Sequence, residues 1–177
     1  MALSQLLSTK KPLIIERWLG LIFQSYPPET ARFLNKEKNR FDNPVGYRIS
    51  QAVQGLVEAL LGEAAPGEIS ALLDEIIRIQ ALQGFTPAQA LAFVFLLKNV
   101  IREELGDALK DALLAAECLE LESRIDGMAL LGFEAYTKRR EKLHEVRLNE
   151  VKNRVSGLLR RSGLTPASLE PEAESTG

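Results

Sequence analysis

The sequence predicts an all-α protein, a single helical bundle that ends in a long helix. Apolar residues recur at three- and four-residue spacing along most of the 177 residues, as on the buried face of a helix. No segment alternates polar and apolar residues between turn signals, so no strand is expected. Prolines that follow a good capping residue mark several helix starts. Together these signals predict six or seven helices.

The helix expected at the centre of the bundle spans about residues 87–105. Thr86 suits the N-cap, Pro87 fits the first turn, and Gln89 stands where a capping box places Glu or Gln. An unbroken apolar run follows at residues 91–97. Because a helix that is apolar on all faces is normally buried on all of them, we expect the other helices to surround it. The side chains expected in the core include Trp18, Val94, Leu97 and Ile101.

Four helices are expected ahead of the central one, over about residues 3–25, 29–35, 44–61 and 66–83. Pro12 either kinks the first of them or begins it again at Leu13. Asn43 is a good N-cap for the third, with Pro44 in its first turn. Gln80 continues the apolar stripe of the fourth, and Gly84 ends that helix.

The chain after the central helix is predicted to form one long helix. Gly106 breaks the preceding helix and Asp107 is the expected N-cap of the next. No proline follows until Pro166, so helix is expected to about Arg161. The composition changes from apolar to charged at Thr137.

A narrow apolar stripe remains in the charged part of this helix, and it is typical of a seam between two helices. Its members are Leu148, Val151, Val155 and Leu158. We therefore expect residues 1–136 to form a helical body and residues 137–163 an extended helix that joins two copies into a homodimer. Residues 164–177 are polar and acidic, and a disordered tail is expected there.

Composition and charge exclude several classes of protein. The formal net charge of -2 gives no general attraction for nucleic acid or an anionic membrane. No run approaches the roughly 18 apolar residues of a membrane helix. The N-terminus lacks the basic start of a signal peptide. We therefore expect a cytoplasmic protein without membrane insertion or nucleic-acid binding. The single cysteine excludes an internal disulfide and a cysteine-based zinc site.

No residue pattern indicates catalysis, metal binding or a cofactor. The one histidine, His144, lies among charged residues, which favours an exposed side chain over a haem ligand or a pH sensor. Cys118 has apolar neighbours, which favours a buried structural thiol over a redox sensor. The carboxylate pairs at 103–104, 120–122 and 170–172 do not form a Glu-x-x-His pattern. A phosphate loop and a serine elbow are also missing, so we expect no enzyme.

Several punctuated stretches share their order and spacing with one family. The residues that carry this likeness are Trp18, Tyr26, Pro27, Phe41, Asn43, Pro44, Val45, Gly46, Tyr47, Phe85, Thr86 and Pro87. With the apolar stretches at 76–80 and 93–98, they resemble the N-terminal domain of the RsbRD-type RsbT co-antagonists over about residues 6–136. The Asn-Pro-Val-Gly element at 43–46 is the most specific part.

The resemblance implies a regulatory protein with a globin-like fold that holds no haem. Members of the wider family place such a sensor module ahead of a STAS domain, and they act in stressosome-type signalling with a kinase partner. The given sequence ends at Gly177 without a STAS domain. It therefore resembles the stand-alone members, which are associated with sulfite-reduction genes in anaerobic sulfate-reducing bacteria. The family supplies no catalytic motif.

Two hypotheses of different classes follow. In the first, the chain is a non-catalytic sensory or regulatory module that binds a protein partner or a small apolar ligand and forms a homodimer. In the alternative, its globin-like body binds haem or another cofactor. A visible absorption spectrum after haem reconstitution separates the two, because a haem site that used His144 would give a Soret band lost in His144→Ala.

Overall fold

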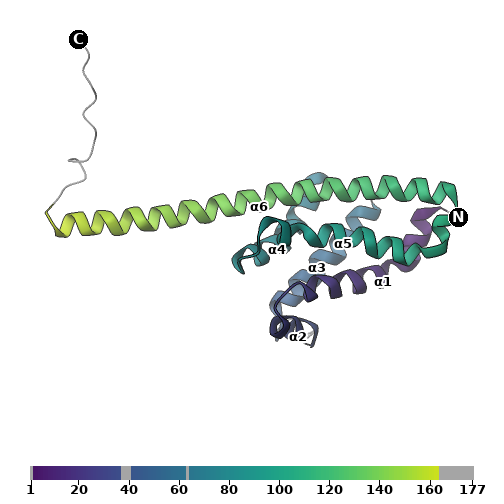
Figure 1. The fold of residues 1–177 in the computed structure, drawn as a ribbon, viewed down its shortest axis with the longest axis horizontal. Helices are drawn as coiled ribbons and strands as arrows, with labels where there is room; N and C mark the ends of the chain where they lie inside the picture. Colours follow the sequence, from purple (N-terminus) through teal and green to yellow (C-terminus); the bar gives the residue numbers. More distant parts are fainter. Residues whose placement is uncertain (1, 37–40, 63, 164–177) are drawn as a thin grey trace, which may run out of the picture. The chain divides into compact units, whose positions relative to one another are not determined.

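The computed structural model describes residues 2–36, 41–62 and 64–163 (Figure 1). Within these ranges the chain forms six α-helices and one short 3-10 helix, with no strand, which confirms the all-α prediction. The elements are α1 (Leu3–Gln24), α2 (Pro28–Lys36), α3 (Pro44–Leu61), α4 (Pro66–Leu82), α5 (Pro87–Leu105), η1 (Gly106–Lys110) and α6 (Ala112–Arg161). The predicted tail, with Glu170 and Glu172, lies outside the described residues.

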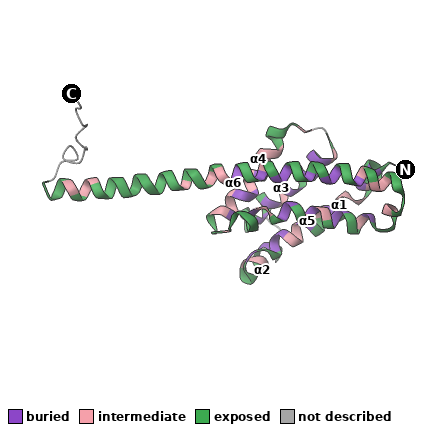
Figure 2. Ribbon diagram, turned by 45° about the horizontal axis from the view of Figure 1, so that its top comes forward, coloured by how far each residue is buried: buried purple, intermediate pink, exposed green. Residues whose placement is uncertain are grey.

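The contacts divide the chain into two units, residues 1–139 and residues 140–177, and α6 contributes to both. The first unit holds the hydrophobic core, where the inward faces of α1, α3, α4, α5 and the first half of α6 are buried (Figure 2). In the described part of the second unit, from residue 140 to residue 163, no side chain is buried. None of the described helices is both long and apolar enough to cross a membrane.

The central helix α5 begins and ends where the sequence predicts. The Thr86 hydroxyl accepts the Gln89 N–H at 3.3 Å, and the Gln89 side chain accepts the Thr86 N–H at 2.9 Å. This reciprocal pair satisfies two N–H groups that the first turn of a helix leaves without partners. Pro87 occupies the first helical position, where its missing N–H costs nothing.

Trp18 joins α1 to α5 in the middle of the core. Its indole N–H donates to the Phe93 carbonyl at 2.7 Å, and the rings of Trp18 and Phe93 are stacked with centroids 6.0 Å apart. The predicted core residues Trp18, Val94, Leu97 and Ile101 are all buried.

The prediction that α5 is buried on all sides is wrong. Phe95 is 49% exposed and Ala92 is also exposed. Phe95 lies two residues from both Phe93 and Leu97, so the helical turn points it away from the face that those two residues bury. An apolar run of seven residues thus overstates how much of the helix surface the neighbouring helices cover.

The glycine after α4 ends that helix, whereas the proline inside α1 does not interrupt it. Gly84, with φ of 80°, ends α4 as predicted, and the Phe85 N–H reaches back to the Gln80 carbonyl at 3.2 Å in a Schellman motif. The helix α1 continues through Pro12 without restarting at Leu13.

The predicted N-cap of the long helix is wrong. Asp107 falls inside η1, and Asp111 caps α6 by accepting the N–H groups of Leu113 and Leu114 at 2.9 and 3.1 Å. The reason is that the chain reverses through a 3-10 turn after Gly106, which delays the helix start. The predicted end at Arg161 is confirmed.

Leu97→Ala tests the placement of α5. Leu97 is fully buried, so we expect unfolding free energy to fall by about 2–5 kcal/mol, the usual cost of truncating a buried leucine. Phe95→Ala on the same helix is the matched control and should change stability by less than about 0.5 kcal/mol. Denaturant titration measures both, and equal effects of the two changes would contradict this assignment of the buried face.

Candidate functional site

A groove opens on the first unit between α1, α2 and α3, with a volume of about 570 Å³. Its lining is largely apolar, from Ile15, Leu19, Phe23 and Leu34. Glu16, Asn35 and Ser50 add polar groups. Sites for small molecules commonly enclose roughly 300–1,000 Å³ with this mixture of apolar surface and a few polar groups.

Gly20 keeps the α1 side of this groove open. A Cβ atom added at Gly20 would meet no neighbouring atom within 4 Å, so the space beside it belongs to the groove. A bulky side chain at this position would therefore enter the groove without displacing the core.

The Asn43–Gly46 element holds two walls of the groove together. The Asn43 Oδ1 accepts the Gly46 N–H at 2.7 Å as the N-cap of α3, and its Nδ2 donates to the Leu34 carbonyl of α2 at 3.2 Å. Asn43 is buried, and a Cβ atom at Gly46 would lie 2.2 Å from Asn43 Nδ2. Only glycine fits there, because any side chain would displace the cap. The element acts as a joint between α2 and α3.

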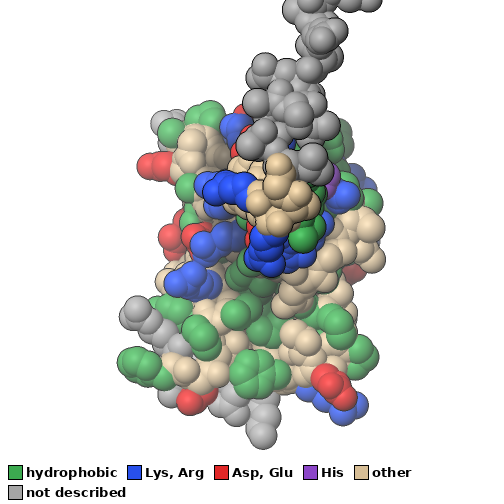
Figure 3. All heavy atoms as spheres, turned by 90° about the vertical axis from the view of Figure 1, so that its left-hand side faces the viewer, with side chains coloured by type: hydrophobic (Ala, Val, Ile, Leu, Met, Phe, Trp, Pro, Cys, Tyr) green, Lys and Arg blue, Asp and Glu red, His purple; other side chains and the backbone are tan. Residues whose placement is uncertain are grey.

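Exposed apolar side chains lie on the same two elements and on the residues that lead into α3. Phe41 is 88% exposed, Phe33 is 49% exposed, and Val45 and Tyr47 are each 37% exposed. Figure 3 shows hydrophobic side chains gathered over the lower part of the face that it presents, which is the end at which α2 lies in Figure 1. We call Phe33, Phe41, Val45 and Tyr47 the apolar patch; Tyr47 also lines the groove.

The structure separates the residues that carry the family likeness into two places. Residues 43–46 form the joint, Gly46 and Tyr47 line the groove, and Phe41 precedes the joint in the chain. Trp18, Tyr26 and Phe85 lie in or against the core, where the rings of Tyr26 and Phe85 have centroids 5.3 Å apart. Thr86 and Pro87 start α5, and exposed Pro27 precedes α2. The likeness thus follows helix ends and core contacts, and sequence reasoning missed the groove residues on α1.

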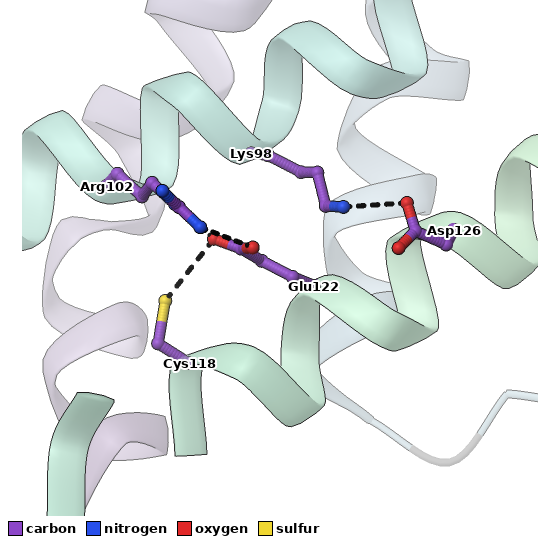
Figure 4. Close-up of polar contacts among 5 residues, drawn as sticks. All are labelled: Lys98, Arg102, Cys118, Glu122 and Asp126. Carbon is purple, nitrogen blue, oxygen red and sulfur yellow. Dashed lines mark hydrogen bonds and ion pairs between the residues drawn. The ribbon is translucent and has the colours of Figure 1, made fainter. Parts of the chain in front are cut away.

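A polar cluster connects α5 to the first half of α6 (Figure 4). Arg102 binds both carboxylate oxygens of the buried Glu122, with Nη2 to Oε2 at 2.7 Å, and Lys98 pairs with Asp126 at 2.7 Å. Hydrogen bonding from Arg102 lowers the pKa of Glu122, although burial opposes this effect. Sequence reasoning missed this pair, because twenty residues separate its members and no local spacing relates them.

Cys118 lies beside this cluster, with its Sγ 3.9 Å from a Glu122 carboxylate oxygen. Burial, followed by the negative charge of Glu122, raises the pKa of the Cys118 thiol, although Arg102 opposes the shift. A reactive thiol requires a lowered pKa and exposure. The predicted burial of the Cys118 thiol is confirmed.

The remaining candidates for chemistry are not among the residues that line the groove. His144 is exposed on the second unit, as expected. In the described ranges no three histidine, cysteine or carboxylate side chains are grouped to hold a metal ion. The predicted seam residues are about half exposed, with Leu148 at 59%, Val151 at 57%, Val155 at 48% and Leu158 at 63%.

Comparison with known proteins adds one finding. Residues 12–151 match the family model of the RsbT co-antagonist protein rsbRD N-terminal domain. The match covers most of the first unit and continues into the second. Searches of curated proteins and of solved structures found no significant match.

The Arg102–Glu122 pair predicts a specific loss of stability in acid. The pKa of Glu122 is lowered in the folded chain from its ordinary value of 4.5. Its contribution to the free energy of unfolding is therefore fully present above that pH and is lost as the pH falls through the folded pKa. Glu122→Gln should remove this part of the pH dependence. Thermal melts between about pH 3 and 7 compare the variant with the wild type, and parallel curves for the two proteins would contradict the prediction.

Proposed function

The chain belongs to the rsbRD N-terminal domain family, and from this premise we propose that it is a non-catalytic regulatory module that binds a protein partner at the groove between α1, α2 and α3. The family comprises regulatory, sensory signalling domains. The observation that carries the proposal is the family match over residues 12–151. The groove and the apolar patch support the choice of surface.

The chemistry of this surface suits a protein partner. Single exposed apolar residues are ordinary on a protein surface, whereas a group of them beside a groove is typical of an interaction site. Three of the four patch residues are aromatic, the residue class enriched in protein interfaces. The apolar lining, with Ile15, Leu19 and Phe23, would accept one or two side chains of the partner. A small apolar ligand would fit the same lining and would compete with that partner.

Filling the groove tests this assignment. Gly20→Leu places a side chain in the groove, and Gly127→Leu is the matched control, because Gly127 is also a helical glycine with no atom within 4 Å of an added Cβ. Both changes should preserve or slightly raise stability, since glycine inside a helix is unfavourable by about 0.5–1 kcal/mol relative to alanine.

Partner binding is measured by quantitative affinity capture from an extract of the source organism. We expect Gly20→Leu to reduce the captured partner at least about tenfold, equivalent to about 1.4 kcal/mol. The control should capture as much partner as the wild type. Equal capture by all three proteins would place the partner site elsewhere.

The same proposal assigns separate tasks to two segments. Residues 1–136 form the recognition body, and residues 137–163 form a helix that joins two copies. An isolated helix is marginally stable in water and gains stability by packing. The seam residues Leu148, Val151, Val155 and Leu158 follow four- and three-residue spacing, which fits pairing with a second copy of the same helix. Nearby Glu150, Lys152 and Arg154 would add weak interhelical pairs.

Charged substitutions in the seam test the dimer. Leu148→Lys combined with Val155→Lys places charges at two seam positions, and we expect the dimer dissociation constant to rise at least about tenfold. Val146→Lys is the matched control, since Val146 is 50% exposed on the same helix and lies off the seam spacing. Sedimentation velocity measures all three proteins. A wild-type monomer at tens of micromolar would contradict the dimer, and a dimer unaffected by the double change would place the interface in the body.

A further inference from the structure

Two buried polar side chains in the core have no hydrogen-bond partner. Gln80 of α4 is fully buried, and neither its Oε1 nor its Nε2 is bonded. The hydroxyl of Tyr26, just beyond the end of α1, is also buried and has no hydrogen-bond partner. These three atoms are the buried side-chain nitrogen and oxygen atoms without a partner in the described part of the chain.

The two side chains lie together. The Gln80 amide lies close enough to the Tyr26 hydroxyl to lower the pKa of that hydroxyl, whereas burial raises it. The two groups nevertheless do not meet hydrogen-bond geometry. Phe85 connects them from a second side, because its ring packs on Tyr26 while its N–H donates to the Gln80 carbonyl. Tyr136 of α6 donates its hydroxyl to the Phe85 carbonyl at 2.9 Å. The ends of α1 and α4 and the first half of α6 therefore meet around one polar position.

Buried amides and hydroxyls are almost always hydrogen-bonded, because an unbonded one has lost its bonds to water without replacement. The Gln80 amide offers donors and an acceptor, and the Tyr26 hydroxyl offers one of each. Three polar atoms are the number that an internal water molecule typically binds.

We propose that Tyr26 and Gln80 form an internal binding site for one small neutral molecule that both donates and accepts hydrogen bonds. Water, a small amide and a small alcohol share this chemistry. The molecule must be neutral because an unpaired charge is strongly disfavoured in a buried site. The surroundings agree, since burial raises the pKa of Tyr26 to about 12 and no charged side chain contributes to that shift. The proposal is independent of the partner groove.

The sign of a stability change tests whether the site is occupied. Gln80→Met and Tyr26→Phe each remove polar atoms at nearly constant shape. If a bound molecule joins the two side chains, each change breaks its bonds, and we expect the melting temperature to fall by about 2–4 °C. Gln83→Met, an exposed amide three residues along, is the matched control and should leave the melting temperature unchanged. A melting temperature that is unchanged or raised in both core variants would overturn the proposal, because it would mean that the three atoms are unbonded.

A second experiment identifies the occupant. A nuclear Overhauser effect between the Gln80 side-chain amide protons and water would show that water fills the site. Millimolar acetamide that raises the melting temperature of the wild type, and leaves that of Gln80→Met unchanged, would show a small amide ligand. Acetate has the same shape and carries a charge, so it should have no effect. Equal stabilisation by acetate, or neither a water signal nor an acetamide effect, would overturn the proposal.

Discussion

The hydrogen bond from Trp18 to the Phe93 carbonyl fixes the position of α1 against α5, and the other features of the structure depend on α1. Trp18 is fully buried, and its indole N–H would be costly without an acceptor. The Phe93 carbonyl supplies one, so α1 and α5 are held in a single relative position by a directional bond as well as by packing. The outer face of α1 lines the groove, and Tyr26 just beyond its end reaches the internal polar position. Both proposed sites therefore rest on the placement of one helix.

Helix boundaries could be predicted where the signal is local. Thr86, Pro87 and Gln89 satisfy the first turn of α5 among themselves, so no distant residue is needed to fix that start. The start of α6 could not be predicted in the same way. Asp107 and Asp111 are both good caps, and the choice between them depends on the 3-10 turn after Gly106, which follows from the path of the chain in three dimensions. Burial of Phe95 was overestimated for a related reason, since composition does not tell how many neighbours surround a helix.

The candidate sites were harder to predict because their residues come from distant parts of the chain. The inward position of Gln80 follows from the apolar stripe of α4, but its nearness to Tyr26 does not. The groove combines three helices, and its α1 residues have no special spacing. The likeness to the family singled out Asn43 and Gly46 but did not indicate what these residues do. The structure shows their role to be the joint between α2 and α3.

The two proposed contact surfaces differ in their physical basis. Charged pairs in the first unit connect α1 to α5 through Arg17 and Glu104, and α5 to α6 through Arg102 and Glu122. An exposed pair such as Arg17–Glu104 contributes little stability, whereas the Arg102–Glu122 pair involves a buried carboxylate. Among the described residues that line the groove, Glu16 is the one with a charged side chain, so the proposed recognition there would rest on apolar contact and shape. In residues 140–163 basic side chains outnumber acidic ones around the seam. This excess of positive charge would oppose the pairing of two copies more than the few pairs with Glu150 would support it. Salt, by screening the net repulsion, would therefore favour pairing at the seam and leave the proposed binding at the groove nearly unchanged.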